Sequence, residues 1–451
     1  MNKGRFTPAW VLLQPFKNTI LFVALIFFGS SNAQELQDQN VQVFFDTTFF
    51  DGEPSSNPHQ RMGAHQLEEY LHLLEGKRVG VVANQTSVIF HTEKQQQNKI
   101  KIDAQGNPVE IINAVEEVVI PKHTHLVDSL LSCGVKVKKV FAPEHGFRGK
   151  ADAGEVVKDG IDKKTGLPII SLYGKNKKPS PAMLQNIDVV IFDIQDVGAR
   201  FYTYISSLHY VMEACAENNI PLIVLDRPNP NGHYIDGPIL EKEYKSFVGM
   251  HPIPVVHGMT IAEYAQLING EKWLKNGVQA KLHLIKMPTY DRKSRYSLPI
   301  KPSPNLPNDQ AISLYPSVCF FEGTNINAGR GTAQQFQVFG SPFLNPKKFT
   351  YTYTPQPNEG AAHPKHKATL CYGKQLMPKE RLSLLNLEYL IDAYNHTADK
   401  KEFFNDFFTK LAGTKTLQQQ IEQGYTTREI RKTWFQGLQE FEKTREKYLL
   451  Y

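Results

Sequence analysis

The sequence predicts an α/β fold, and two observations lead to this prediction. Short apolar runs alternate with helical patterns from Leu67 onward, which is typical of parallel strands joined by helical crossovers. Beyond about residue 290, closely spaced prolines and Gly/Asn-rich loops replace this alternation. We therefore expect a Rossmann-like, mostly parallel sheet domain over 61–290 and a smaller α+β auxiliary domain over 291–451.

The individual elements follow from apolar periodicity. Near-continuous apolar runs are typical of strands buried on both faces of a parallel sheet, and apolar residues three to four apart are typical of helices. The predicted strands of the first domain are 77–84, 135–142, 188–193, 221–225 and 253–256. Its predicted helices are 125–133, 204–215 and 260–268, and a polar insertion at 93–120 has the pattern of a hairpin. In the second domain we expect a strand at 349–354 and helices at 382–394 and 433–448.

The N-terminal leader has the pattern of a secretory signal peptide. Basic Lys17 precedes an apolar run at 20–28, and small residues follow up to Ala33. This run is shorter than the ~20 residues that a membrane-spanning helix needs. We predict a signal peptide over 1–33, a linker over 34–60 and an exported protein, periplasmic or extracellular, with no integral membrane segment after signal removal.

The composition and the absence of several known motifs exclude some classes of function. The chain is 41% apolar and 21% charged, as in ordinary globular proteins. Its formal net charge of +6 is not gathered into a basic stripe, so no nucleic-acid partner is expected. The absence of CxxC, GxGxxG, P-loop, HExxH and GxSxG motifs disfavours structural zinc, dinucleotides, NTPases, zincins and α/β-hydrolases. We expect the four cysteines to be free and buried, and we predict no metal or organic cofactor.

Polar residues follow every predicted strand of the first domain. Ligands of open parallel sheets bind beyond the carboxyl ends of the strands, so these residues are candidates for a common cleft. They are Asn84 after the first strand, Glu144, His145 and Arg148 after the second, Asp193, Asp196 and Arg200 after the third, Asp226 and Arg227 after the fourth, and His257 after the fifth.

This set is rich in carboxylates, which favours chemistry on sugars. In glycoside hydrolysis one carboxylic acid protonates the leaving oxygen while a second carboxylate assists attack at the anomeric carbon. We take Glu144 as the general acid/base, His145 as the residue that orients it, and Asp193 or Asp196 as the second carboxylate. Purely structural roles remain possible for four of these residues. Asp193 and Asp196 could cap a helix, and Asp226 and Arg227 could form an ion pair.

Several ordered strings resemble one known family. They include VGVVANQTS (79–87), FAPEHGFRG (141–149), DAGE (152–155), SLYG (171–174), FDIQDVGARFYTYISSL (192–208), VLDRPNP (224–230) and FEGTNINAGRGT (321–332). Together they resemble the NamZ-type exo-β-N-acetylmuramidases, formerly a family of unknown function. The resemblance implies a cell-wall recycling enzyme that releases terminal N-acetylmuramic acid from the non-reducing end of peptidoglycan fragments. It also implies a site between the two domains, with Glu144 as the catalytic residue.

A peptidoglycan-derived oligosaccharide is therefore the expected partner, and the sequence leaves the oligomeric state open. Arg200, with Arg148 or Arg330, would hold the lactyl carboxylate of N-acetylmuramic acid, because guanidinium groups bind carboxylates through two parallel hydrogen bonds. The full set expected to bind substrate is Asn84, Arg148, Glu155, Arg200, Tyr202, Asp226, Arg227, His257, Glu322 and Arg330.

Two alternatives remain, and the chain departs from the family pattern in two places. One alternative is a metal-dependent hydrolase that uses His123, His125, His145 or His257. The other is a non-catalytic peptidoglycan-binding protein. The 93–120 insertion lengthens the first crossover, and Gln335-Phe336-Gln337 stands where the family pattern leads us to expect a carboxylate, so no catalytic acid is assigned there.

Overall fold

A computed structural model describes residues 61–102, 108–148, 159–378, 380–398 and 400–451, with the backbone alone between 92 and 121. The described chain forms two compact units. One contains residues 92–122, and the other contains 61–91 and 123–451. The predicted signal peptide and linker lie outside the described residues.

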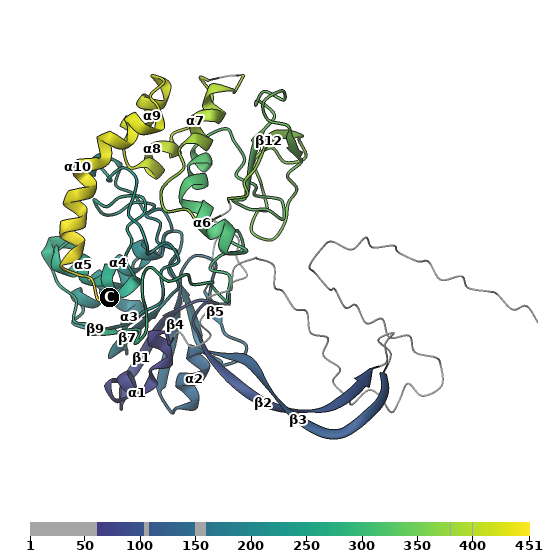
Figure 1. Ribbon diagram of the computed structural model, residues 1–451. Coiled ribbons are helices and arrows are strands. Elements are labelled where there is room, and N and C mark those ends of the chain that lie inside the picture. The colour runs from purple at the N-terminus through teal and green to yellow at the C-terminus, as the bar shows by residue number, and fades with distance from the viewer. Residues whose placement is uncertain (1–60, 103–107, 149–158, 379, 399) are drawn as a thin grey trace, which may run out of the picture. The chain divides into compact units, whose positions relative to one another are not determined.

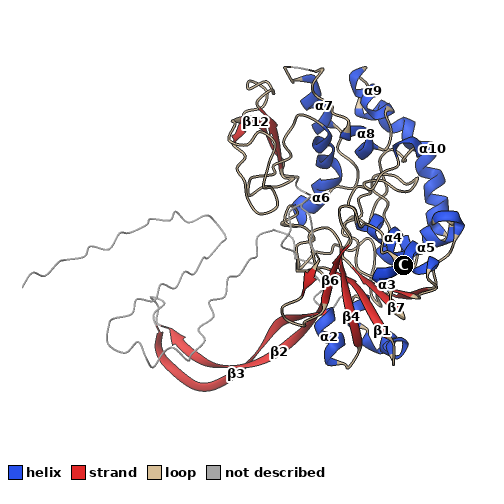
Figure 2. Cartoon of the chain, turned by 180° about the vertical axis from the view of Figure 1, so that it is seen from behind, coloured by secondary structure: helices blue, strands red, loops and turns tan. Residues whose placement is uncertain are grey.

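The larger unit is built on a seven-stranded sheet with the order β5-β6-β4-β1-β7-β8-β9 (Figure 2). All neighbouring strands run parallel except β5 and β6, which are antiparallel. The strands are β1 (Arg78–Ala83), β4 (Lys136–Ala142), β5 (Gly160–Ile161), β6 (Pro168–Ser171), β7 (Val189–Asp193), β8 (Leu222–Leu225) and β9 (Leu282–Ile285). Four of the five predicted strands are thus confirmed, as β1, β4, β7 and β8.

The fifth predicted strand, 253–256, is wrong. Its only pairings among the described residues are single bridges from Val256 to Ala199 and Asp236. Pro252 and Pro254 explain this, because proline has no N–H to donate to a sheet. The place beside β8 is taken by β9, which the apolar pattern did not reveal.

Helices cover both faces of the sheet (Figure 1). Side chains alternate between the faces along β7: Val189 and Ile191 pack with α1 and α2, whereas Val190 and Phe192 pack with α4 and α5. The helices of this part are α1 (Leu67–Tyr70), α2 (Leu126–Ser132), α3 (Pro181–Leu184), α4 (Tyr204–Glu217) and α5 (Ile261–Gly270), and the 3-10 helices are η1 (Gly63–His65), η2 (Leu71–Leu74), η3 (Lys242–Tyr244) and η4 (Lys275–Gly277). The predicted helices at 125–133, 204–215 and 260–268 are confirmed.

The C-terminal part has the predicted α+β character. It contains a small antiparallel sheet with the order β10-β12-β11 and several helices. Its elements are α6 (Asp309–Val318), η5 (Cys319–Gly323), β10 (Val338–Ser341), β11 (Tyr351–Tyr353), β12 (Cys371–Gln375), α7 (Glu388–Asn395), α8 (Phe407–Ala412), α9 (Thr416–Glu422) and α10 (Thr427–Glu446). One hydrophobic cluster extends across the predicted boundary at residue 290: Phe201 and Phe320 pack edge to face, 5.9 Å apart. That boundary stays a prediction.

The smaller unit contains most of a hairpin. β2 (Val88–Ile102) and β3 (Pro108–His125) pair in a two-stranded sheet, so the hairpin predicted within the 93–120 insertion is confirmed. Its tip, 103–107, lies outside the described residues.

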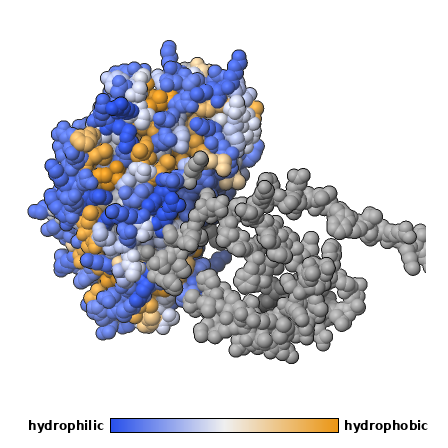
Figure 3. Space-filling view, in the orientation of Figure 1, coloured by the Kyte–Doolittle hydropathy of each residue, from blue (hydrophilic) through white to orange (hydrophobic). Residues whose placement is uncertain are grey.

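The surface and the cysteines complete the description. Figure 3 shows a mainly hydrophilic face with scattered apolar patches. Among the helices that the structure describes, none combines the length and apolarity needed to cross a bilayer. All four cysteines are free; Cys215, Cys319 and Cys371 are buried as expected, but Cys133 ends α2 in an exposed position.

Candidate active site

Glu144 lies in a tight turn directly after β4. The turn is closed by a hydrogen bond of 3.0 Å from the amide of Gly146 to the carbonyl of Pro143. Its third residue, His145, has a φ of +69°, in the left-handed region that glycine usually occupies. This turn places the Glu144 side chain at the carboxyl edge of the sheet, where it is partly exposed, while His145 is buried beside it.

Two hydroxyl groups hold the carboxylate of Glu144. Tyr173, which follows β6, donates to Oε1 over 3.1 Å. Thr203, which immediately precedes α4, donates to Oε2 over 2.8 Å. All three side chains are partly exposed. The sequence analysis did not single out Tyr173 or Thr203, although both lie in the strings that resemble the family.

Asn84 and Tyr202 are buried, and Asn84 is linked to this turn through Tyr204. Asn84 is fully buried and donates to the hydroxyl of Tyr204 over 2.9 Å, and Tyr204 donates to the backbone carbonyl of Glu144 over 3.4 Å. Tyr202 is buried and donates to the carbonyl of Pro302 over 2.8 Å. Both were expected to bind substrate; burial and internal hydrogen bonds place them in the framework instead.

Asp193 and Arg227 form a sealed ion pair at the ends of β7 and β8. The guanidinium of Arg227 donates to both carboxylate oxygens of Asp193, over 2.6 and 2.8 Å. Asp193 is fully buried; burial raises its pKa, and the Arg227 charge opposes this rise. Neither residue reaches solvent, so the prediction of Asp193 as second carboxylate and of Arg227 as substrate ligand is corrected to a structural ion pair.

Asp226 is also sealed, at the end of β8. Its Oδ2 accepts hydrogen bonds of 2.8 Å from the hydroxyls of Thr260 and Tyr451, and its Oδ1 accepts one of 3.0 Å from the amide of Ala262. Burial raises the pKa of Asp226 to about 7. The expected substrate-binding role of Asp226 is therefore corrected: Tyr451 covers this end of the sheet.

Asp196 and His257 face each other below the surface. Asp196 Oδ2 accepts from the amide of Gly198 over 2.6 Å and lies 3.7 Å from His257 Nε2. Both residues are buried, and within the described part of the chain neither Asp196 Oδ1 nor His257 Nε2 has a hydrogen-bond partner. Because these atoms have no accessible surface, neither the catalytic role of Asp196 nor the substrate-binding role of His257 fits this arrangement.

Arg200 holds backbone segments together. It is fully buried, and its guanidinium donates to the carbonyls of Pro238, Ile253, Leu411 and Ala412 over 2.7–3.0 Å. Burial lowers its pKa to about 9. The prediction of a lactyl-carboxylate seat at Arg200 is wrong, because the side chain is fully buried and both of its terminal nitrogens donate to backbone carbonyls on the two sides of residue 290.

Two other arginines keep some exposure. Arg148 is paired with Asp162 over 2.7 Å and lies over the ring of Phe147. Arg330 lies 3.5 Å from the carboxylate of Glu322 and donates to the carbonyl of Gly360 over 2.9 Å, and both members of the Arg330–Glu322 pair have side chains that are 22% exposed.

Glu322 and Glu144 act on the same tyrosine. Burial raises the pKa of Tyr315, with Cys319 and then the charges of Glu144 and Glu322 adding to the rise. Of the three arginines expected to bind the lactyl group, Arg148 and Arg330 keep exposed side-chain surface, 32% and 22% respectively.

Glu155 and the histidines considered as metal ligands are the remaining residues expected in the site. Glu155 is outside the described residues. His125 caps α2 and contacts the carbonyl of Asn84 over 2.9 Å, and burial lowers its pKa to about 4. Among the residues that the structure describes, no three His, Cys, Asp or Glu side chains are grouped as metal ligands would be.

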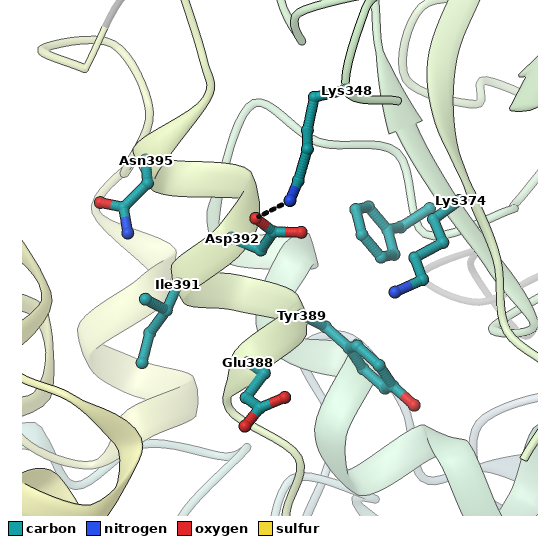
Figure 4. A pocket seen from close by; sticks show the side chains of 8 residues that line it. Lys348, Lys374, Glu388, Tyr389, Ile391, Asp392 and Asn395 are labelled. Atoms are coloured by element: carbon teal, nitrogen blue, oxygen red, sulfur yellow. Dashed lines mark ion pairs between the residues drawn. The ribbon is translucent and has the colours of Figure 1, made fainter. Parts of the chain in front are cut away.

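A separate pocket of about 310 Å³ lies on the C-terminal part, beside α7 (Figure 4). Lys348 and Asp392 form an ion pair of 3.5 Å within it. Phe339, Lys374, Glu388, Tyr389, Ile391 and Asn395 complete its lining. None of these residues was expected in the site.

Comparisons with known proteins identify the family to which this chain is similar. The family "Exo-beta-N-acetylmuramidase NamZ, N-terminal" matches residues 109–310, and the corresponding C-terminal family matches 313–451. The "Peptidoglycan beta-N-acetylmuramidase NamZ" of Bacillus subtilis (strain 168) is 40% identical over 406 residues, which cover 85% of this chain and 89% of that relative.

Two solved structures resemble this chain in fold and sequence. A DUF1343 family protein from Bacteroides fragilis NCTC 9343 superposes with a TM-score of 0.72 at 40% identity, covering 86% of this chain and 98% of that one. A second DUF1343 protein from the same organism gives a TM-score of 0.68 at 29% identity, with coverages of 87% and 98%. The chain therefore belongs to the NamZ exo-β-N-acetylmuramidase family.

Proposed function

We propose that this chain is an exo-β-N-acetylmuramidase that releases terminal N-acetylmuramic acid from the non-reducing end of peptidoglycan fragments, with Glu144 as its general acid/base. Family membership supports the activity. The observation that carries the role of Glu144 is its place: a partly exposed carboxylate at the end of a central strand, with each oxygen hydrogen-bonded to a hydroxyl.

The proposed chemistry uses Glu144 twice. Protonated Glu144 gives its proton to the glycosidic oxygen as the bond to the anomeric carbon breaks, and the resulting carboxylate then takes a proton from the attacking water. Asp193 and Asp196 are not proposed as the second group, because both are buried. The acetamido oxygen of the substrate is proposed instead as the group that assists at the anomeric carbon.

Substrate recognition is proposed to depend on Arg330. N-acetylmuramic acid differs from N-acetylglucosamine by a lactyl ether that ends in a carboxylate, and a partly exposed guanidinium suits that group. We further propose that the protein is exported and cleaved near Ala33, because residues 1–33 have the pattern of a signal peptide. N-terminal sequencing of the secreted form checks this point.

The test of the function is Glu144→Gln, assayed with 4-nitrophenyl N-acetylmuramic acid and with a disaccharide that carries N-acetylmuramic acid at its non-reducing end. We expect turnover of the disaccharide to fall roughly 10²- to 10⁴-fold, as for loss of a general acid/base, and turnover of the nitrophenyl glycoside to fall less. Thermal unfolding should be nearly unchanged because the side chain is partly exposed. Glu69→Gln, on the exposed surface of α1, is the control.

Each alternative predicts a different result. Activity retained in Glu144→Gln contradicts the role of Glu144. A wild-type protein that binds the glycan but releases neither nitrophenol nor sugar is the non-catalytic binder. Activity that is lost on exhaustive chelation and restored by metal identifies the metal-dependent hydrolase.

A further inference from the structure

We propose that Thr203 and Tyr173 are positioning residues that hold Glu144 in the same orientation in both of its protonation states. This inference rests on the proposed role of Glu144 as acid/base. It assigns functions to two side chains that contact Glu144 from elements distant in sequence: Thr203 at the start of α4 and Tyr173 after β6.

Thr203 does not make the capping hydrogen bond that a threonine side chain usually makes at a helix N-terminus. It is the N-cap of the 14-residue helix α4, yet its side chain makes no capping hydrogen bond. Thr260 at the start of α5 shows the usual arrangement, because its hydroxyl accepts from the amide of Glu263 in a capping box. The hydroxyl of Thr203 is directed to Glu144 Oε2 instead. A stabilising cap is thus absent where a hydroxyl faces the proposed catalytic carboxylate.

Tyr173 holds the other carboxylate oxygen. β6 lies directly beside β4, so the residue that follows β6 falls next to the turn that carries Glu144. The backbone of Tyr173 is fixed by a 3.3 Å hydrogen bond from its amide to the hydroxyl of Ser171. Burial, followed by the nearby Glu144 carboxylate, raises the pKa of Tyr173, so its phenol stays neutral and acts through hydrogen bonds.

Hydroxyl partners suit a carboxyl group that must gain and lose a proton. A hydroxyl can donate one hydrogen bond and accept two, so it can donate to carboxylate oxygens and accept from a protonated carboxyl. A guanidinium can only donate and therefore favours the ionised acid, as Arg227 does for Asp193. In the acid/base cycle of a glycosidase, Glu144 alternates between the two states. Thr203 and Tyr173 can bond to it in both.

The test compares Thr203→Val, Thr203→Ser and Tyr173→Phe in the full chain. We expect kcat on the disaccharide to fall roughly 10- to 100-fold in Thr203→Val and Tyr173→Phe, with KM nearly constant, as for loss of a hydrogen bond to a charged group. Thr203→Ser retains the hydroxyl and should restore most of kcat. On the 4-nitrophenyl glycoside the losses should be smaller, because nitrophenolate leaves with little help from an acid.

Matched controls separate positioning from general damage. Thr260→Val removes a hydroxyl from another helix N-terminus, and Tyr70→Phe removes a buried phenol that donates to the carbonyl of Ala64. Both should lower stability and leave kcat and its dependence on the leaving group unchanged.

The experiment distinguishes failure of this inference about Thr203 and Tyr173 from failure of the proposed role of Glu144. If Glu144→Gln is inactive but Thr203→Val and Tyr173→Phe turn over like the wild type, only this inference is overturned. Equal losses on both substrates, or changes in KM alone, also overturn it. An active Glu144→Gln instead rejects the proposed role of Glu144 itself.

Discussion

The two sides of the sheet's carboxyl edge hold carboxylates in opposite environments. On the β4–β6 side, Glu144 is partly exposed and its oxygens accept hydrogen bonds from the hydroxyls of Tyr173 and Thr203. On the β7–β8 side, Asp193 is fully buried and both its oxygens are bound by the guanidinium of Arg227. The sequence gives no sign of this difference, since each acid simply lies at or just beyond the end of an apolar strand.

Partners and exposure, more than position at a strand end, distinguish the acid proposed as catalytic from the structural one. A buried ion pair holds its acid in one charge state and excludes substrate, and removing one partner leaves an uncompensated charge in the interior. A partly exposed acid held by hydroxyls can change its charge and meet a ligand. The β7–β8 side therefore stabilises the fold, and the β4–β6 side is available for chemistry.

Removing the buried acid should have the largest effect on stability. In Asp193→Asn the Arg227 guanidinium stays buried without its counter-charge, so we expect the free energy of unfolding to fall by about 3–5 kcal/mol. Urea denaturation measures this loss. Asp188→Asn, which removes the partner of Arg78 in a partly exposed ion pair, should lower the free energy of unfolding much less. A stable Asp193→Asn variant with turnover as low as that of Glu144→Gln would reverse the assignments of the two sides.

The same contrast applies to the arginines expected to bind the lactyl group. Arg330→Ala should raise KM for the N-acetylmuramic acid glycoside roughly 10- to 100-fold, because it removes a charge-assisted contact with the substrate carboxylate. It should leave the weaker turnover of an N-acetylglucosamine glycoside unchanged. Arg200→Ala should instead destabilise the protein, because four buried carbonyls lose their donor. An equal effect of Arg330→Ala on both glycosides would contradict a lactyl seat.

Much of the fold could be predicted because its cause is local. β1, β4, β7 and β8 are near-continuous apolar runs, and their burial on both faces leaves that pattern in the sequence. The edge strand β9 is only partly buried and lacks such a run. The false strand at 253–256 was apolar for another reason: Ile253 belongs to the hydrophobic cluster under α4 and α5, while the flanking prolines prevent pairing.

Only part of the candidate site could be predicted, because its other contacts join distant segments. The place of Glu144 follows from the end of β4. Its contact with Tyr173 depends on β6 lying beside β4, and its contact with Thr203 on how α4 begins. Local sequence likewise does not show that Arg227 pairs with Asp193 instead of the adjacent Asp226, or that Arg200 is enclosed by segments from two predicted domains.

Asp226 combines features of both sides and tests the comparison most finely. It is fully buried like Asp193, but two of its partners are the hydroxyls of Thr260 and Tyr451, as hydroxyls hold Glu144. Burial chiefly, with the nearby Glu263 carboxylate, raises its pKa from 3.8 to about 7, whereas the hydrogen bonds it accepts lower it. The folded state therefore binds a proton that the unfolded state releases between about pH 4 and 7, and this contribution to stability is lost as the pH rises through that window.

In Asp226→Asn the side chain stays neutral, and the two hydroxyls can turn to accept from its amide. We expect the free energy of unfolding to fall less between pH 4.5 and 7.5 in this variant than in the wild type, as measured by urea denaturation at both values. If Asp226→Asn has the pH dependence of the wild type, Asp226 keeps one charge state throughout. In that case, hydrogen bonds from hydroxyl groups would not be enough to let a buried acid change its charge. The difference between Glu144 and Asp193 would then depend only on how exposed each carboxylate is.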